Sequence, residues 1–156
     1  LDLDGNQLVT LPDSIAALMT LQTLYLGYNK FTTFPKPIVK LTSLTKLYLN
    51  DNQLVTLPDS IAALTALETL RLGYNKFTTF PKPIVKLTSL TELDLDGCQL
   101  VTLPDSIAAL TAVKTLKLNN NPLAKPQSSA VEAWLMALEA GGCEVEMVDS
   151  DEDSGW

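Results

Sequence analysis

Leucine and a few other apolar residues return along this chain at constant places in a unit of 23 residues. Each unit reads L-x-x-L-x-L-x-x-N-x-L/F-x-x-L/F-P-x-x-I-x-x-L-x-x. A shortened unit, four full units and the start of a last one follow each other: 1–20, 21–43, 44–66, 67–89, 90–112 and 113 onward. A strict period of this length predicts a solenoid, in which each unit buries its apolar face against its neighbours.

The L-x-L segment of each unit alternates inward leucines with an outward residue, as a half-buried strand requires. One such strand cannot bury its apolar face alone, so stacked units must form a parallel sheet over one continuous core. We therefore expect strands at 1–3, 23–26, 46–49, 69–72, 92–95 and 115–118.

A proline follows the strand segment of each unit and prevents an extended ladder from continuing: Pro12, Pro35, Pro58, Pro81 and Pro104. In some units the next residues are Asp-Ser-Ile-Ala-Ala-Leu, which predicts a helical turn on the convex side. In the others Pro-Lys-Pro stands there, at 35–37 and 81–83, and we expect 3₁₀ or extended turns because this sequence does not easily start a regular helix.

Asparagine stands at the ninth position of the unit, where its side chain can bond backbone groups as the chain leaves the strand: Asn6, Asn29, Asn52, Asn75 and Asn121. Cys98 takes this place once, and we interpret it as a small buried group and not as a reactive thiol. The phenylalanines fall on inward positions and are expected to fill the core: Phe31, Phe34, Phe77 and Phe80.

The recurring pattern resembles the leucine-rich repeat family, in its 23-residue subtype with an L-P-x-x-I segment. That subtype is typical of intracellular eukaryotic proteins, among them Ras-binding and Ras-suppressor proteins and the arrays that precede the GTPase of ROCO proteins. The resemblance covers residues 1 to about 121. It implies an α/β fold, a right-handed horseshoe segment with a parallel β-sheet on its concave side and 3₁₀ or short helical turns on its convex side.

Two kinds of unit alternate, so the true period is 46 residues. The first kind contains Gln-Leu-Val-Thr-Leu-Pro-Asp-Ser-Ile-Ala-Ala-Leu, and the second contains Lys-Phe-Thr-Thr-Phe-Pro-Lys-Pro-Ile-Val-Lys-Leu. The convex side therefore presents a column of alternating charge: Asp13, Lys36, Asp59, Lys82 and Asp105. Each exposed pair contributes only ~0–1 kcal/mol, so the alternation affects solubility and register more than stability.

After the array at 1–121, the chain departs from the repeat, and we expect a C-terminal cap made of a helix and a strand at 122–148. Ser129 and Glu132 have capping-box spacing, which predicts a helix at 130–140. Gly141 is expected to end this helix, and Trp134 on its apolar face is expected to be buried against the last repeat. Alternation from Cys143 to Met147 predicts a last strand.

The two ends of the chain differ from the array. Residues 149–156 form an acidic tail, expected to be a solvated tail or linker, in which Ser150 resembles an acidic-directed kinase site. Leu1 enters at the fourth position of the repeat without a lid over its edge. We expect a piece of a longer array, and an unpaired sheet edge also leaves end-to-end self-association open.

Composition and charge narrow the classes of function. The chain has no histidine, which removes the commonest general base and metal ligand, and its two cysteines are too few for a disulfide framework or a zinc site. Residues 1–121 hold ten acidic and ten basic residues, so the net charge of −7 lies at 122–156. Without a basic cluster, nucleic-acid binding is disfavoured, and no apolar run is long enough to span a membrane.

The concave face carries the candidate binding residues. Its central column reads Asp2, Tyr25, Tyr48, Arg71, Asp94 and Lys117. Neighbouring strands lie ~4.8 Å apart, so Tyr25 and Tyr48 can stack, and Arg71 can lie on Tyr48 or pair with Asp94. Tyr28 and Tyr74 flank this row where the strands end.

Differences between units concentrate on this same face. Units 21–43 and 67–89 differ only at Gln22/Glu68 and Tyr25/Arg71, both in the strand segment. Tyrosine and arginine are enriched at binding hot spots. The family resemblance implies that a protein partner binds here, at Tyr25, Tyr28, Tyr48, Arg71, Tyr74, Asp94 and Lys117.

The sequence thus favours a non-catalytic protein–protein interaction module within a longer regulatory or signalling protein. No nucleophile–base pair, phosphate loop or metal-ligand spacing is found in it, so we expect no catalytic residues, no cofactor and no metal. A structural or engineered, idealised scaffold that associates through its first edge is the alternative. The absence of a disulfide framework and the resemblance both favour a cytoplasmic location.

Overall fold

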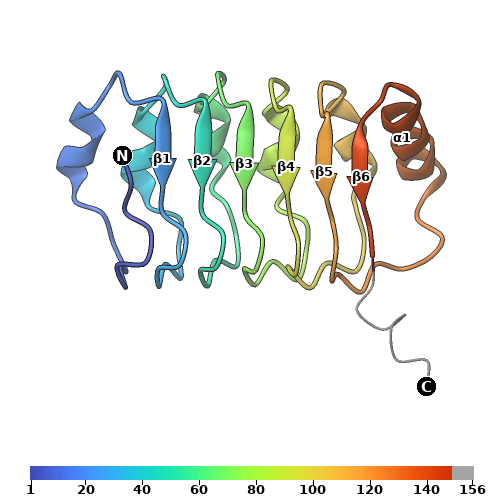
Figure 1. The fold of residues 1–156 in the computed structure, drawn as a ribbon, viewed down its shortest axis with the longest axis horizontal. Helices are drawn as coiled ribbons and strands as arrows, with labels where there is room; N and C mark the ends of the chain where they lie inside the picture. Colours follow the sequence, from blue (N-terminus) through green and yellow to red (C-terminus); the bar gives the residue numbers. More distant parts are fainter. Residues whose placement is uncertain (149–156) are drawn as a thin grey trace.

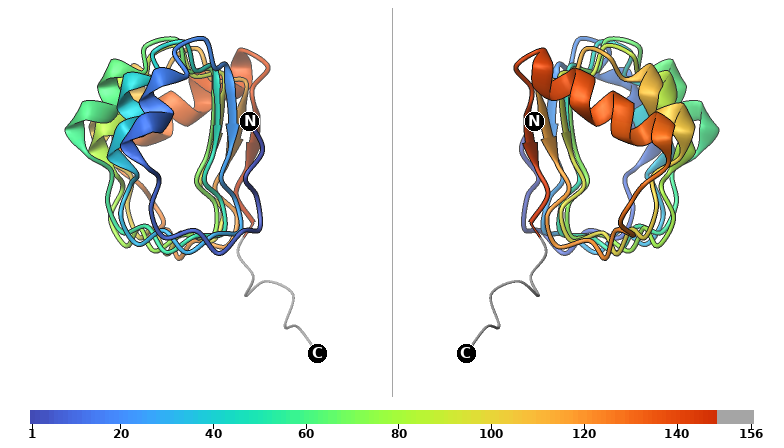
Figure 2. Two further views of the ribbon diagram at one scale, coloured as in Figure 1. Left: turned by 90° about the vertical axis from the view of Figure 1, so that its left-hand side faces the viewer. Right: turned by 90° about the vertical axis from the view of Figure 1, so that its right-hand side faces the viewer.

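The computed structural model describes residues 1–148 and shows a solenoid whose strands stand side by side in the order of the sequence (Figure 1). The single parallel sheet contains β1 (Thr23–Tyr25), β2 (Lys46–Tyr48), β3 (Thr69–Arg71), β4 (Glu92–Asp94), β5 (Thr115–Lys117) and β6 (Glu144–Glu146). Seen along the array, the sheet forms one side of each coil and the 3₁₀ turns form the opposite side (Figure 2). The leucine-rich core lies between them.

The 23-residue period sets the register of the sheet, because equivalent residues of successive units lie opposite each other. Tyr25 is the partner of Tyr48, and Tyr48 is the partner of Arg71. Each strand has three residues, which for β1–β5 is one fewer than expected, although Leu26 N still donates to Tyr48 O at 2.8 Å. The strand expected at 1–3 is reduced to an isolated bridge between Asp2 and Tyr25.

All the return segments contain a 3₁₀ turn of five residues: η1 (Asp13–Ala17), η2 (Lys36–Lys40), η3 (Asp59–Ala63), η4 (Lys82–Lys86) and η5 (Asp105–Ala109). The expected difference between the two kinds of unit is therefore absent. Pro37 fits the second position of η2 because the first N–H groups of a helix need no intrahelical partner. Within residues 1–148, no ion pair within 4.0 Å joins Asp13 to Lys36, so the convex charges alternate without direct contact.

A ladder of asparagines ties each unit to the previous one. Asn75 is representative: its Nδ2 donates to Leu72 O (2.8 Å) and Leu49 O (2.9 Å), and its Oδ1 accepts from Leu54 N (2.9 Å). Its equivalents in the other units are buried in the same way: Asn29, Asn52 and Asn121. Asn6 is exposed because no unit covers it.

Cys98 occupies the same place in the ladder and is fully buried, as expected. Its Sγ lies 3.3 Å from Leu72 O, so the thiol replaces one of the amide's donor functions. Burial raises the pKa of this thiol to about 12, which keeps it protonated and unreactive. The expected inward placement of the phenylalanines is also confirmed: Phe31, Phe34, Phe77 and Phe80 are all buried.

A helix, α1 (Ser129–Ala140), closes the C-terminal end of the core (Figure 1). Trp134 is 5 % exposed and donates from Nε1 to Leu110 O at 3.0 Å, which confirms its expected burial. The predicted capping residue, Ser129, is wrong by one position. Ser128 is the N-cap, because its Oγ accepts from Val131 N at 3.3 Å.

The helix ends at Gly141 as predicted, and Gly142 follows in the left-handed region with φ +84°. Gly142 N donates to Glu139 O and Cys143 N donates to Leu138 O, both at 2.9 Å. These are the two bonds of a Schellman motif, which turns the chain back toward the sheet. The predicted last strand is confirmed as β6, which pairs in parallel with β5.

The structure describes no helix long and apolar enough to cross a membrane. The expectations for the acidic tail and Ser150 lie outside the described residues.

Candidate functional site: the outward face of the sheet

The candidate site is the outward face of the sheet, made by the first and third residues of β1–β6. We call it the sheet face; it is the concave face of the sequence analysis. The middle residue of every strand points into the core, so its two neighbours must point away from it. The third residues form a column that contains most of the predicted binding residues: Tyr25, Tyr48, Arg71, Asp94 and Lys117. Glu146, from the cap, is the last residue of the column and was not predicted to bind.

The first half of this column is an ordered stack of large side chains. The rings of Tyr25 and Tyr48 lie 4.5 Å apart with an interplanar angle of 14°, which confirms the expected stacking. The guanidinium carbon of Arg71 lies 5.2 Å from the centre of the Tyr48 ring, on which it was expected to lie. Burial raises the pKa of Tyr48, although Arg71 acts in the opposite direction. One face of the Tyr48 ring therefore stacks on another aromatic ring, and the other face has a cation–π contact with Arg71.

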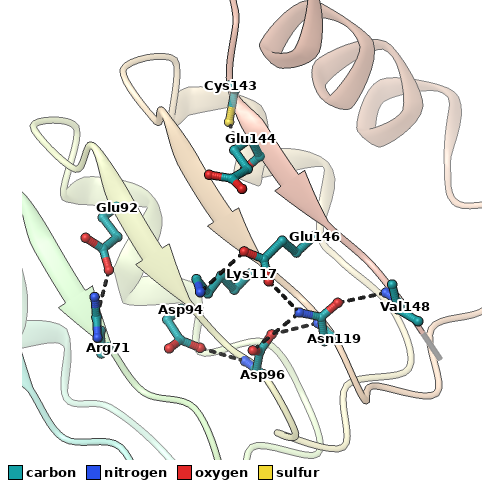
Figure 3. Close-up of polar contacts among 10 residues, drawn as sticks. All are labelled: Arg71, Glu92, Asp94, Asp96, Lys117, Asn119, Cys143, Glu144, Glu146 and Val148. Atoms are coloured by element: carbon teal, nitrogen blue, oxygen red, sulfur yellow. Dashed lines mark hydrogen bonds and ion pairs between the residues drawn. The ribbon is translucent and has the colours of Figure 1, made fainter. Parts of the chain in front are cut away.

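Arg71 makes its ion pair with a different acid from the one expected. Its Nε lies 2.7 Å from Glu92 Oε1, whereas the sequence suggested Asp94, its partner in register. Glu92 is the first residue of β4 and reaches Arg71 diagonally across the face (Figure 3). Burial opposes the charge of Arg71, but Glu92 outweighs it and the pKa of Arg71 is raised. The register alone does not indicate Glu92, because it stands opposite Thr69 and not opposite Arg71.

The second half of the face is a polar network joined to the cap (Figure 3). Asp94 Oδ1 accepts from Asp96 N at 3.0 Å, and Asp96 Oδ1 accepts from Asn119 N at 2.7 Å. Asn119 Nδ2 in turn donates to Glu146 Oε2 at 2.8 Å. Burial raises the pKa values of Asp94 and Asp96 more than these bonds lower them. Backbone N–H groups therefore hold the two carboxylates in place, although burial removes part of their hydration.

Lys117 belongs to the same network. Its Nζ lies 3.3 Å from Glu146 Oε1, so this lysine, which was predicted to contact a partner, is paired with the cap. The sequence indicated that Glu146 lies on a last strand. It did not indicate which residue of β5 would face it, because the cap breaks the 23-residue period.

Tyr28 and Tyr74 lie where the strands end, beside the sheet face, and are 63 % and 52 % exposed. Both have left-handed backbone, with φ +52° and φ +56°. A residue with a side chain pays roughly 1–2 kcal/mol for this conformation, and glycine stands at the equivalent place in other units, for example Gly97. The Tyr74 ring lies against Gly97, where an added Cβ would be only 2.7 Å from the ring. The two tyrosines thus occupy a costly backbone position while leaving much of their rings exposed.

These residues offer contact surface: aromatic rings, hydroxyls and charged groups held by neighbours. Residues 1–148 contain no group of three or more His, Cys, Asp or Glu placed to hold a metal ion. The structure brings Tyr25, Tyr48 and Arg71 together and joins Asp94 to Lys117 through other residues. Tyr28 and Tyr74 stay at the border of the face.

Comparison with protein families gives one match, to the model described as leucine rich repeat, over residues 1–54 and 42–100. Together the matched segments cover more than half of the chain. The comparison with curated proteins gives no match.

Many solved structures resemble the fold. A leucine-rich repeat protein of Leptospira interrogans is 30 % identical over 94 % of this chain and 48 % of its own, with a TM-score of 0.54. The ectodomain of the receptor kinase GASSHO1/SCHENGEN3 of Arabidopsis thaliana, in complex with CASPARIAN STRIP INTEGRITY FACTOR 2, is 32 % identical over 78 % and 15 %, with a TM-score of 0.61. The plant peptide hormone receptor RGFR1, in complex with RGF2, is 25 % identical over 90 % and 22 %, with a TM-score of 0.67. The chain thus spans less than half the length of each.

Proposed function

The chain belongs to the leucine-rich repeat family, and on that basis we propose that its sheet face binds a protein or peptide partner. The contact residues are Tyr25, Tyr28, Tyr48, Arg71, Tyr74, Asp94 and Lys117. The stack of Tyr25, Tyr48 and Arg71 is the observation on which the proposal rests. Large side chains already fixed by neighbours lose little further freedom on binding, and tyrosine and arginine dominate interface energetics.

Two further observations support the proposal. The units 21–43 and 67–89 share their interior residues and differ only near this face, where Tyr25 is replaced by Arg71. Two similar structures, the GASSHO1/SCHENGEN3 ectodomain and the plant peptide hormone receptor RGFR1, are complexes with CASPARIAN STRIP INTEGRITY FACTOR 2 and with RGF2, respectively. The family consists generally of non-catalytic interaction modules, and we assign the chain to this class.

The finer parts of the assignment are also proposals. The L-P-x-x-I segments suggest the 23-residue subtype found in intracellular Ras-group and ROCO-like arrays, in which the chain would be part of a longer regulatory or signalling protein. A cytoplasmic location stays a prediction. Fractionation of source cells followed by detection of the protein tests it.

Affinity capture from a lysate of the source organism tests the binding function. The bait is the chain, beside a variant with Tyr25→Ser, Tyr48→Ser and Arg71→Glu that circular dichroism shows to be folded. A matched control changes exposed residues elsewhere, Val55→Ser and Lys82→Glu. We expect a protein that the chain and the control retain and the face variant loses. Equal capture by all three would contradict the proposal.

An apolar surface on the first unit supports a second candidate, a self-associating structural scaffold. Leu1 and Leu18 are 46 % and 44 % exposed and line an open pocket of about 470 Å³ together with Leu3, Leu11 and Ile15. A second copy could cover this surface end to end, although identical copies would bring like charges such as Asp13 close together. Analytical ultracentrifugation across a concentration series tests this candidate. A monomer that persists at millimolar concentration would exclude it.

A further inference from the structure

We infer that the partner of the sheet face is an extended segment whose Lys or Arg side chains lie over β4–β6 while an apolar or aromatic side chain contacts the Tyr25–Tyr48 stack. This inference rests on the proposed function and adds the chemistry and orientation of the partner.

The charges of the sheet face are divided along the array. The outward residues of β1–β3 include two cations, Lys46 and Arg71, and no acid. The outward residues of β4–β6 include one cation, Lys117, and four acids: Glu92, Asp94, Glu144 and Glu146. A segment lying across all six strands therefore meets a neutral-to-positive half and then a negative half.

Internal ion pairs leave the negative half with acceptor groups to spare. Arg71 is paired with Glu92, and Lys117 is paired with Glu146. In the described part of the chain, neither Asp94 nor Glu144 has a cation within 4.0 Å. Asp96, beside Asp94, adds a further carboxylate to this end of the face, held by Asn119. A cation from a partner would form ion pairs with these carboxylates, whereas an anion would be repelled.

The aromatic half offers fewer carboxylates: none lies on β1–β3, although Asp2, whose Oδ1 accepts from Asp4 N, is the neighbour of Tyr25 beyond β1. Aromatic faces attract Lys and Arg, but Tyr48 already has Tyr25 on one face and Arg71 on the other. Lys46, on the same strand as Tyr48, adds repulsion to any further cation. The exposed edges of the stack therefore favour apolar or aromatic contact, and the cationic residues of the partner are directed to β4–β6.

The size of the face sets the length of the segment. Six strands spaced ~4.8 Å apart cover roughly 24 Å, which an extended chain of about seven or eight residues spans at ~3.3 Å per residue. A peptide of this length is short enough to be supplied as a library.

Selection from a phage-displayed library of random twelve-residue peptides on the immobilised chain tests the inference. We expect the selected peptides to combine an aromatic or large apolar residue with two or more Lys or Arg. Their affinity should fall about tenfold for a chain with Asp94→Asn and Glu144→Gln, and should fall with added salt. The control Asp13→Asn and Asp59→Asn has the same net charge as this variant but changes the convex turns, and we expect its affinity to stay within about twofold of the parent.

The outcomes separate the inference from the function on which it rests. If no peptide is selected, the inference of an extended segment fails, and the affinity capture described above decides the proposed function separately. If selected peptides bind a Tyr25→Ser, Tyr48→Ser chain as well as the parent, the proposed function fails and the inference fails with it. If peptides depend on the two tyrosines but show no cationic enrichment and tolerate Asp94→Asn and Glu144→Gln, only the inference is overturned. Circular dichroism of each variant confirms that loss of binding is not loss of fold.

Discussion

The asparagine ladder and the sheet face are built by the same units, yet one residue type recurs in the ladder while the residues of the face change from unit to unit. Asn29 and Asn75 stand at equivalent places and make equivalent bonds to the units before them. On the face of the same two units, Tyr25 stacks on a ring while Arg71 pairs with a carboxylate. Inside the array a side chain must satisfy fixed backbone groups, so one residue type recurs. Outside it, one substitution changes the chemistry of the surface without disturbing the coil.

Truncation of the tryptophan in the cap should give the largest loss of stability and thereby show how much the closed interior contributes. Trp134→Ala removes a buried indole and its bond to Leu110 O, so we expect the free energy of unfolding to fall by about 3–5 kcal/mol. Urea denaturation followed by circular dichroism measures it. Met136 lies on the same helix but is 69 % exposed, and Met136→Ala is the matched control with a change below about 0.5 kcal/mol. A Trp134→Ala chain as stable as the control would contradict the role of α1 as a lid.

Removal of one ladder amide tests the interior directly. Asn75→Ala leaves Leu54 N without its partner and takes a donor from Leu49 O and Leu72 O, so we expect a loss of about 2–4 kcal/mol. Asn6→Ala at the exposed end of the ladder is the control, with a change below about 0.5 kcal/mol. Equal effects of the two substitutions would show that burial of the amide does not determine its contribution to stability.

The one exception in the ladder gives a smaller, stabilising effect. Cys98 lacks the amide oxygen that in the neighbouring unit accepts from Leu54 N, and the equivalent donor before Cys98 is the N–H of Phe77. Cys98→Asn supplies this acceptor, so we expect the free energy of unfolding to rise by about 1 kcal/mol. Thermal unfolding of the parent, Cys98→Asn and Cys98→Ala chains measures the change. A lower melting temperature for Cys98→Asn than for the parent would mean that this unit has no room for the amide.

On the face, a change of charge should have the smallest effect, and the size of this effect depends on pH. Because burial raises the pKa of Asp94 above 3.8, the folded chain binds this proton more readily than the unfolded chain does. Stability therefore rises as the pH falls through the folded pKa, and the ionised carboxylate costs a little at neutral pH. Asp94→Asn keeps an acceptor for Asp96 N, so we expect it to gain up to about 0.5 kcal/mol at pH 7.

The free energy of unfolding of Asp94→Asn and of the parent, measured at a series of pH values, tests this prediction and contains its own control. At about pH 3, below the unfolded pKa, the side chain of the parent is protonated in both states, and the difference between Asp94→Asn and the parent should disappear. A difference that stays constant from pH 7 to pH 3 would show that the substitution acts through packing and not through charge.

Much of the fold could be predicted from spacing alone, because a constant period fixes register, inward positions and the place of the asparagines. The stack of Tyr25 on Tyr48 followed from that register. Contacts between different positions of the unit did not: the Arg71–Glu92 pair depends on side-chain rotamers, and Glu146 reaches Lys117 only through a cap without the period. The 3₁₀ turns expected after Pro-Lys-Pro are confirmed; the difference expected for the Asp-Ser-Ile segments is absent, since the fixed distance between stacked coils imposes the same 3₁₀ geometry on both kinds of sequence.

The alternation of turns that begin with Asp and turns that begin with Lys has a consequence for inheritance. Loss of the single unit 44–66 would bring Lys36 beside Lys82 and would stack two phenylalanine-containing units on each other. Loss of the pair 44–89 would instead bring Lys36 beside Asp105, and every junction would be of a kind that the array already has. Recombination in steps of 46 residues therefore preserves the stack, while steps of 23 residues do not. Longer and shorter descendants of this array are expected to differ by even numbers of units.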